Sequence, residues 1–301
     1  DLFFFFYTYQ AIEKQNKGND NRLIMGPWTH GGWESKDWSR FAGYTFNANT
    51  SVAFQQMELN FFNHFLKDKG DFKNAEATVF VTGSNQWMSF DEWPPKEAIV
   101  QKWKLSESLQ LLLNNTDAQA GSDKYVSDPS NPVPYINKKS GDRINEYMAA
   151  DQSFASQRND VLYYESKVLE KDITICGPIT AKLFASLSTT DADFIVKVID
   201  VLPDGTSTQQ LVRAEVLRGK FRNNFTTPQP FEPGKPEQVQ FILNDVAHTF
   251  LRGHKIMIQI QSSWFPLADR NPQQFMNIYE AKPEDFKKAT IKIYHDGSNS
   301  S

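Results

Sequence analysis

The hydrophobic period of this 301-residue chain changes near residue 70, and this change constrains the fold more than any other feature. From residue 71 onward, apolar and polar residues alternate in short runs, which is the period of a β-strand. Turn residues such as Pro233-Gly234 separate the runs. The predicted strands cover residues 77–82, 100–104, 109–113, 161–164, 173–186, 194–202, 210–217, 239–243, 255–261 and 290–294. A series of strands without intervening helices predicts an all-β sandwich of the jelly-roll type over residues 71–301.

One long segment interrupts this strand series. Residues 115–160 are rich in Asp, Ser, Asn and Pro, and Pro129, Pro132 and Pro134 fall close together within them. Proline lacks a backbone N–H and disfavours a helical conformation in the residue before it. We therefore expect an extended, turn-rich excursion between two strands.

The first 70 residues have a different character. They predict a helix at residues 2–15, a buried strand at 22–25 and a second helix at 52–67. In the second helix the apolar residues recur at helical spacing, at Phe54, Met57, Phe61, Phe62 and Phe65. A chain rarely begins with a bare apolar helix, so we expect a longer polypeptide whose upstream part covers residues 3–6.

The loop Gly26-Pro27-Trp28-Thr29-His30-Gly31-Gly32-Trp33 follows the predicted strand at 22–25. Pro27 and the two glycines prevent the strand from continuing. In open α/β sheets, ligands and chemistry collect at the carboxyl ends of strands. This position makes His30 a candidate active-site base, and the residues alone leave open the alternative of a solvent-exposed loop histidine.

Composition excludes several classes of protein. The formal net charge of −4 argues against a nucleic-acid-binding surface, which needs a basic stripe. No apolar run reaches the length of a membrane span. The single cysteine, Cys176, excludes an intrachain disulfide, and its apolar flanks predict a buried strand position.

Metal and cofactor sites are not predicted either. The five histidines lack the paired spacing with carboxylates that a metal site requires. Asp191-Ala192-Asp193 is typical of a turn before a strand rather than of a calcium loop. No glycine-rich phosphate loop is present, and we expect no cofactor.

A second class of function is also open. Aromatic residues make up 14% of the chain, and Trp87, Trp93, Trp103 and Trp264 could stack on sugars. The alternative to an enzyme is therefore a non-catalytic jelly-roll module that binds carbohydrate or a protein partner. For most of these tryptophans a role in the core or between domains is favoured over sugar stacking.

An ordered series of motifs carries a family resemblance. The series begins with the octapeptide of residues 26–33 and continues with residues 127–134, 193–194, 200–205, 253–254, 262–266 and 270–272. On these motifs the chain resembles the X-prolyl dipeptidyl peptidase and cocaine esterase family of serine hydrolases. It is most similar to the branch of the α-amino-acid ester hydrolases and glutaryl-cephalosporanic-acid acylases, over essentially all of its length.

This resemblance implies a fold and a site. Residues 1–70 would be the C-terminal portion of an α/β-hydrolase domain, the last part of its sheet and helices, followed by the jelly roll. His30 falls on the base of the family's Ser-His-Asp triad. Asp1 falls either on the triad aspartate or on a neighbouring acidic residue that binds a substrate α-ammonium group. Asp1, Trp28 and Trp33 are the predicted substrate-binding residues.

The nucleophile is the departure from the family. The Gly-x-Ser-x-Gly pattern of a nucleophile elbow does not occur, and Gly83-Ser84-Asn85 is predicted to be a turn that enters the sandwich. The serine would lie in an upstream hydrolase part, which is the expected partner, and this chain alone is expected to be inactive. The expected substrates are small esters or amides of acyl or α-amino-acyl groups. The resemblance favours a periplasmic or secreted location over the cytoplasm and leaves a homo-oligomer open.

Overall fold

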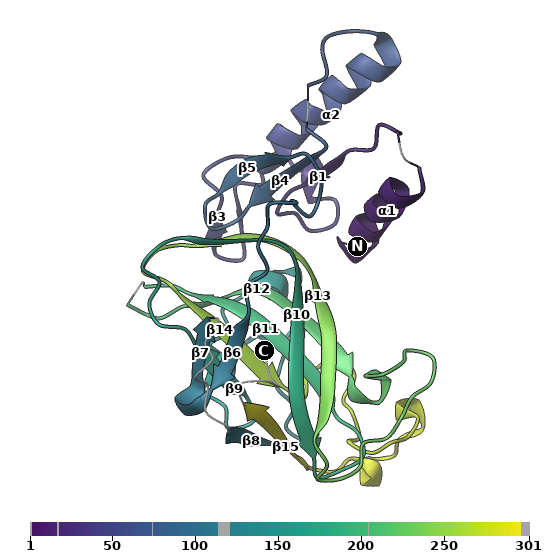
Figure 1. Cartoon of the computed structure of the whole chain (residues 1–301), viewed down its shortest axis with the longest axis vertical. Coiled ribbons are helices and arrows are strands. Elements are labelled where there is room, and N and C mark those ends of the chain that lie inside the picture. The colour runs from purple at the N-terminus through teal and green to yellow at the C-terminus, as the bar shows by residue number, and fades with distance from the viewer. Residues whose placement is uncertain (1, 17, 74, 114–120, 204, 296–301) are drawn as a thin grey trace. The chain divides into compact units, whose positions relative to one another are not determined.

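The computed structural model describes residues 2–16, 18–73, 75–113, 121–203 and 205–295 (Figure 1). The chain forms two compact units, and each is built from three separate segments of sequence. Unit 1 comprises Asp1–Ile99, Lys171–Pro178 and Asn244–Leu251. Unit 2 comprises Val100–Glu170, Ile179–Leu243 and Arg252–Ser301. The predicted boundary at residue 70 remains a prediction.

Unit 1 contains a β-α-β crossover. Its main elements are α1 (Leu2–Gln15), β1 (Leu23–Met25), α2 (Thr50–Lys67), β4 (Ala77–Val81) and β5 (Gln86–Phe90). The strand order is β1-β4-β5, with β1 parallel and β5 antiparallel to β4. Parallel neighbours need a long crossover connection, and here α2 lies within it. Both predicted helices and the predicted first strand are present.

The core of unit 1 lies around β4. Phe6 and Tyr9 of α1 pack with Leu23, Val79 and Trp93 in one buried cluster. The rings of Phe6 and Trp93 stack with their centroids 5.9 Å apart. Tyr9 donates a hydrogen bond to Glu76 (2.8 Å), and burial together with that carboxylate raises the pKa of the Tyr9 phenol. Through these contacts α1 is fixed to the sheet.

The predicted apolar face of α2 is only partly used. Among its described residues the helix fully buries only Thr50 and Ser51, whereas Phe62 and Phe65 are 45% and 43% exposed. The rings of Phe61 and Phe65 pack against one another and against Phe72, with centroids 4.7–5.5 Å apart. The helical spacing of these residues is therefore confirmed, but within the described residues they form a half-exposed aromatic cluster rather than a core.

Unit 2 is mostly sheet, which is consistent with the predicted β-sandwich. One sheet has the order β13-β10-β15-β8, and the other has the order β12-β11-β14-β9-β7-β6. The strands are β6 (Trp103–Ser106), β7 (Gln110–Leu113), β8 (Gly121–Ser127), β9 (Leu162–Glu165), β10 (Ile173–Leu187), β11 (Asp193–Val201), β12 (Gln209–Arg218), β13 (Glu237–Phe250), β14 (Lys255–Gln261) and β15 (Ala289–His295). The first residues of β10, up to Pro178, and the last residues of β13, from Asn244, belong to unit 1. A hydrogen bond from the Tyr164 hydroxyl of β9 to Asp123 of β8 (2.9 Å) joins the two sheets.

Short elements complete the chain. They are β2 (Arg40–Phe41), β3 (Tyr44–Thr45), α3 (Ser153–Ser156) and the 3₁₀ turns η1 (Gly32–Glu34), η2 (Glu107–Leu109), η3 (Asn145–Ala149), η4 (Gly219–Phe221), η5 (Ile278–Glu280) and η6 (Pro283–Asp285). No helix in the described part of the chain has the length and apolarity that a membrane crossing requires.

The sequence did not predict β5 and β8. Both strands lie at the edge of their sheets, where only one side is paired and polar residues are tolerated. β8 falls inside the predicted excursion of residues 115–160, so that expectation is corrected for residues 121–127. β5 directly follows Gly83-Ser84-Asn85, so this turn closes a hairpin of the sheet in unit 1 and does not enter the sandwich. Some residues of the predicted features lie outside the described residues. They are Asp1, residues 115–120 of the excursion, Asp204 and residues 297–301 of the C-terminal region.

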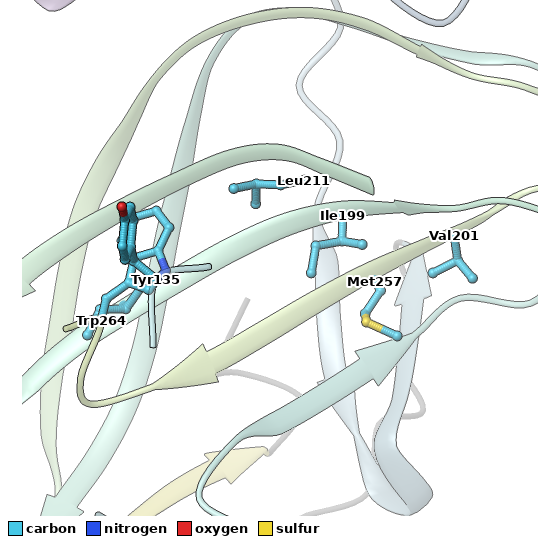
Figure 2. Close-up of a cluster of buried hydrophobic side chains, with 7 residues drawn as sticks. Tyr135, Ile199, Val201, Leu211, Met257 and Trp264 are labelled. Carbon is cyan, nitrogen blue, oxygen red and sulfur yellow. The ribbon is translucent and has the colours of Figure 1, made fainter. Parts of the chain in front are cut away.

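The rest of the excursion covers a sheet. Every residue of β11 is buried, which requires apolar or polar cover on both faces of the strand. Tyr135, from the excursion, lies beside Trp264 in a buried cluster that also contains Ile199, Leu211 and Met257 of three adjacent strands (Figure 2). The excursion therefore supplies one of the two faces that bury β11.

A buried polar cluster fastens this cover. Lys197 of β11 is fully buried, and its Nζ donates to the Gln152 side-chain oxygen of the excursion (2.8 Å). Gln259 of β14, directly opposite Lys197, donates to the side-chain oxygen of Gln209 (3.0 Å) and to the backbone oxygen of Gln152 (3.3 Å). Burial lowers the pKa of the Lys197 ammonium to about 7.

Candidate active site

The loop with the candidate histidine begins where β1 ends. β1 stops at Met25, and residues 26–33 continue into the short η1 turn. β1 lies parallel to β4, so the loop leaves the carboxyl end of a parallel strand, as predicted from the sequence. Such ends are where α/β sheets hold ligands and reactive groups.

His30 stands at the tip of a tight turn. The Gly32 N–H donates to the Thr29 carbonyl (2.9 Å), which closes a four-residue turn around His30 and Gly31. Gly31 has φ 78° and ψ −4°, the left-handed conformation of the third residue of a type II turn. His30 is the second residue of this turn, and its side chain is exposed.

Replacing Gly31 by alanine in the whole protein is expected to lower the free energy of unfolding by about 1 kcal/mol, because a Cβ is strained at positive φ. Space is not the reason, since a Cβ at Gly31 would meet no atom within 4 Å. Gly141 is the matched control: it is equally open, and its φ is outside the left-handed range. Urea unfolding of both variants measures the difference, and equal stability of the two would contradict the turn assignment.

Trp28 fixes the start of the loop. Its ring lies directly over Gly26, where a Cβ would come within 2.4 Å of the indole. The indole Nε1 donates to the Thr50 hydroxyl of α2 (3.1 Å), and the ring packs edge-on against Phe54 with centroids 5.1 Å apart. Gly26 is therefore required by the position of Trp28, and Trp28 is required to join the loop to α2.

Trp38 fixes the loop from its other side. Its Nε1 donates to the Pro27 carbonyl (2.8 Å), and its ring is 3.1 Å from the position of a Cβ on Gly32. The Trp38 backbone is bound at both groups: its N–H donates to the Asn49 side chain (3.0 Å), and its carbonyl accepts from the Thr50 hydroxyl (3.0 Å). Both tryptophans thus converge on the N-terminus of α2.

Trp33 lies beside the histidine. The two rings meet edge to face with centroids 5.6 Å apart. The Trp33 carbonyl accepts a hydrogen bond from the Gln55 side chain (3.0 Å), which also donates to Ser35 (3.2 Å). The structure brings Trp33 and His30 together, whereas the Trp28 ring turns toward α2. Asp1 lies outside the described residues.

Other candidate residues have local partners. His64 is half-buried, with Nδ1 2.9 Å from the Gly70 carbonyl and its ring against Phe65. The Ser84 hydroxyl donates to the Val81 carbonyl (3.3 Å) in the β4–β5 hairpin. Cys176 is half-buried in β10, and burial raises the pKa of its thiol.

The tryptophans proposed for sugar stacking are largely covered. Trp93 and Trp264 are each 4% exposed, so neither ring offers a face to a ligand. Trp87 is half-buried against Trp28 and Phe80, with centroids 5.9 and 5.4 Å apart. The described structure therefore contradicts a sugar-stacking role for Trp93 and Trp264.

Several motif residues of unit 2 stabilise the fold. His254 Nδ1 lies 2.8 Å from the Asp200 carboxylate. The Asn271 amide donates to both Asp191 (3.2 Å) and Asp193 (2.7 Å), which are fully buried. Burial raises the pKa of Asp193 to about 6, and Asn271 and Arg218 oppose that shift. Among the described residues, no group of three or more His, Cys, Asp or Glu side chains could hold a metal ion.

Sequence reasoning missed the residues that hold the loop. Asn49, Thr50, Trp38 and Gln55 carry no catalytic signature in the sequence. One signal was available, because Asn49 lies just before the predicted helix at 52–67 and is a favoured N-cap residue. In the structure its side chain accepts from the Val52 N–H and also from Trp38, so the cap of α2 is also part of the loop.

The chain thus combines two kinds of unit. One has a β-α-β crossover and carries an exposed histidine on a braced turn, and the larger one is mostly sheet. Residues 70–301 match the sequence model of the X-Pro dipeptidyl-peptidase C-terminal non-catalytic domain, and the chain belongs to this family. The resemblance to the X-prolyl dipeptidyl peptidase and cocaine esterase family is thereby confirmed.

Individual relatives agree with this assignment. The cocaine esterase of Rhodococcus sp. (strain MB1 Bresler) is 28% identical over 300 residues, which are 95% of this chain and 51% of that protein. The structure of an α-amino acid ester hydrolase superposes with a TM-score of 0.92 at 33% identity, over 98% of this chain and 51% of that one. An aminopeptidase from a marine sediment Thaumarchaeota archaeon superposes with a TM-score of 0.89 at 34% identity, over 97% and 50%. The chain thus spans about half the length of these relatives.

Proposed function

We propose that the whole protein is a serine hydrolase and that His30 is its general base. The observation that carries this proposal is the exposed His30 imidazole, held on a braced type II turn at the carboxyl end of β1. The names of the relatives support the reaction class, since they include an esterase, an ester hydrolase and an aminopeptidase. The substrates would be esters or amides of acyl or α-amino-acyl groups.

The proposed architecture divides the chain near residue 70. Residues 1–70 would be the C-terminal portion of an α/β-hydrolase domain, and residues 71–301 would form a jelly roll. Two features support the first part. β1 and α2 of this part form a β-α-β crossover with β4, which lies beyond residue 70 but in the same compact unit, and β1 has β4 as its one strand neighbour in the described sheet. The other edge of β1 can accept a further strand from the part of the polypeptide outside this chain.

The proposed mechanism uses His30 twice. The imidazole takes the proton of a serine hydroxyl as the serine attacks the substrate carbonyl, and it then gives the proton to the leaving group. Water, activated by the same imidazole, hydrolyses the acyl-enzyme. A carboxylate orients the ring, and this is either Asp1 or an upstream residue with Asp1 in a site for an α-ammonium group. Trp33, edge-on to His30, would line the acyl pocket, whereas the Trp28 ring packs toward α2 and would support the loop, and no cofactor takes part.

Labelling the whole protein with a fluorophosphonate probe tests the origin of the nucleophile. The probe reacts with activated serines, so we expect one labelled serine, located in the polypeptide upstream of residue 1 of this chain. Peptide mapping by mass spectrometry identifies the position. A label on Ser84 or on any other serine of this chain would overturn the assignment, because no Gly-x-Ser-x-Gly elbow is present here.

The substrate class needs its own measurement. A panel of p-nitrophenyl and amino-acyl methyl esters, assayed with the whole protein, should show turnover of small acyl or α-amino-acyl esters. Absence of turnover for every ester in the panel would leave the non-catalytic binding module as the better account. A periplasmic or secreted location and a homo-oligomer also remain proposals of the family resemblance.

A further inference from the structure

The Thr50 hydroxyl joins the segments of chain that precede and follow His30. The residue is the first of α2 and is fully buried. Its Oγ1 accepts a hydrogen bond from the Trp28 indole (3.1 Å) and donates one to the Trp38 carbonyl (3.0 Å). Trp28 precedes His30 by two residues, and Trp38 follows it by eight. The segments before and after His30 therefore meet at the same side chain.

The helix itself does not need this hydroxyl. Asn49 is the N-cap of α2, and its side-chain oxygen accepts from the Val52 N–H (3.4 Å) and from the Ser51 hydroxyl (2.7 Å). Thr50 makes no side-chain bond to the helix. The Thr50 hydroxyl instead bonds Trp28 and Trp38, whereas the side chain of an ordinary capping residue bonds the N–H groups of the helix.

The tryptophans transmit this constraint to the turn. The Trp28 ring cannot shift toward Gly26, because the two are already in contact, and Trp28 and Trp38 both pack against Gly32. Gly32 closes the turn through its bond to Thr29. A change at Thr50 would consequently reach the backbone on both sides of His30.

We propose that Thr50 is a positioning residue for His30. Its hydroxyl fixes the loop of residues 26–33 to the N-terminus of α2 and thereby sets the direction of the imidazole. The inference rests on the proposed function of His30 as the base. Thr50 is fully buried, and its hydroxyl is engaged by Trp28 and Trp38, so its loss should affect kcat rather than substrate binding.

The test uses the whole protein and a p-nitrophenyl ester that it hydrolyses. Thr50→Val keeps the shape of the side chain and removes both hydrogen bonds, and it should lower kcat by about 10- to 100-fold with KM changed less than about twofold. Thr50→Ser restores the hydroxyl and should recover kcat to within about threefold of the original. Failure of either result would overturn the proposal.

Thr82→Val is the matched control. Thr82 also lies in unit 1, and its hydroxyl bonds the Ala247 carbonyl (3.1 Å) and lies 2.8 Å from the His248 ring, neither of which belongs to the loop of residues 26–33. It should lose thermal stability comparably to Thr50→Val while keeping kcat within about twofold. An equal loss of kcat in both variants would mean that Thr50 acts only through stability.

Trp28→Phe removes the indole donor of the hydrogen bond to Thr50. This variant replaces Thr50→Val in the test if Thr50→Val does not fold. It should lower kcat as Thr50→Val does, and the double variant should lose no more than the larger single loss. His30→Ala separates the two proposals. Retained turnover in His30→Ala overturns the proposed function, whereas lost turnover there with full kcat in both Thr50→Val and Trp28→Phe overturns the positioning role alone.

Discussion

Replacing His30 by alanine in the whole protein is expected to lower kcat for ester hydrolysis by about 10⁴-fold or more. Without the imidazole, the serine hydroxyl has no acceptor for its proton during attack, and the leaving group has no donor. KM should change little, because His30 acts on the reacting atoms rather than on the bound acyl group. Steady-state kinetics and the rate of fluorophosphonate labelling measure the two consequences, and both rates should fall together.

His64→Ala is the control for this experiment. His64 is the other histidine of the described residues that precede β4, and it contacts Gly70 and the aromatic cluster of α2 rather than the loop. Its replacement should leave kcat within about twofold. Turnover of the His30→Ala protein at the original rate would end the catalytic assignment.

Replacing Lys197 by methionine is expected to stabilise the protein by about 2 kcal/mol at pH 7. Burial lowers the pKa of Lys197 to about 7, whereas in the unfolded chain the amine titrates near its ordinary value. Between these two values the unfolded state binds a proton and the folded state does not, so stability falls as the pH decreases toward 7. Methionine removes this loss, at the cost of the hydrogen bond to Gln152.

The pH dependence is the specific part of this prediction. The advantage of Lys197→Met should be full at and below pH 7 and should shrink as the pH rises toward the ordinary lysine pKa. Urea unfolding at pH 7 and pH 9.5 measures it. Lys124→Met is the control, since Lys124 is an exposed residue of strand β8 and should shift stability by less than about 0.5 kcal/mol at either pH. A gain for Lys197→Met that is equal at both pH values would contradict the buried-amine explanation.

Most of the helices and strands could be predicted from the spacing of the hydrophobic residues. The buried strands β4, β11 and β14 were predicted, because strands near the middle of a sheet need apolar or β-branched residues. β5 and β8 were missed for the opposite reason: an edge strand is paired on one side, and sequences such as Gly121-Ser122-Asp123-Lys124 satisfy that condition. The layer of residues 128–160 was also missed, since no local pattern shows which distant face a loop covers.

The site was only half predictable. His30 and its two glycines are a local pattern, and the turn they form follows from the backbone conformation that glycine allows. The bonds that brace the turn are long-range: Thr50 is 22 residues from Trp28 and 12 from Trp38. A single sequence does not record which hydroxyl meets which indole. The spacing of the apolar residues of α2 likewise predicted a helix without revealing that Phe62 and Phe65 stay half-exposed.

The segmented composition of unit 1 has a consequence for the order in which the protein is made. Unit 1 takes its last residues from Asn244–Leu251. A nascent chain therefore cannot complete this unit when Asp1–Ile99 has emerged from the ribosome. The histidine turn is translated before any residue of unit 2, but the unit that contains it closes only after most of unit 2 has been translated. Completion of unit 1 is therefore timed by the length of the sheet segments inserted between its parts.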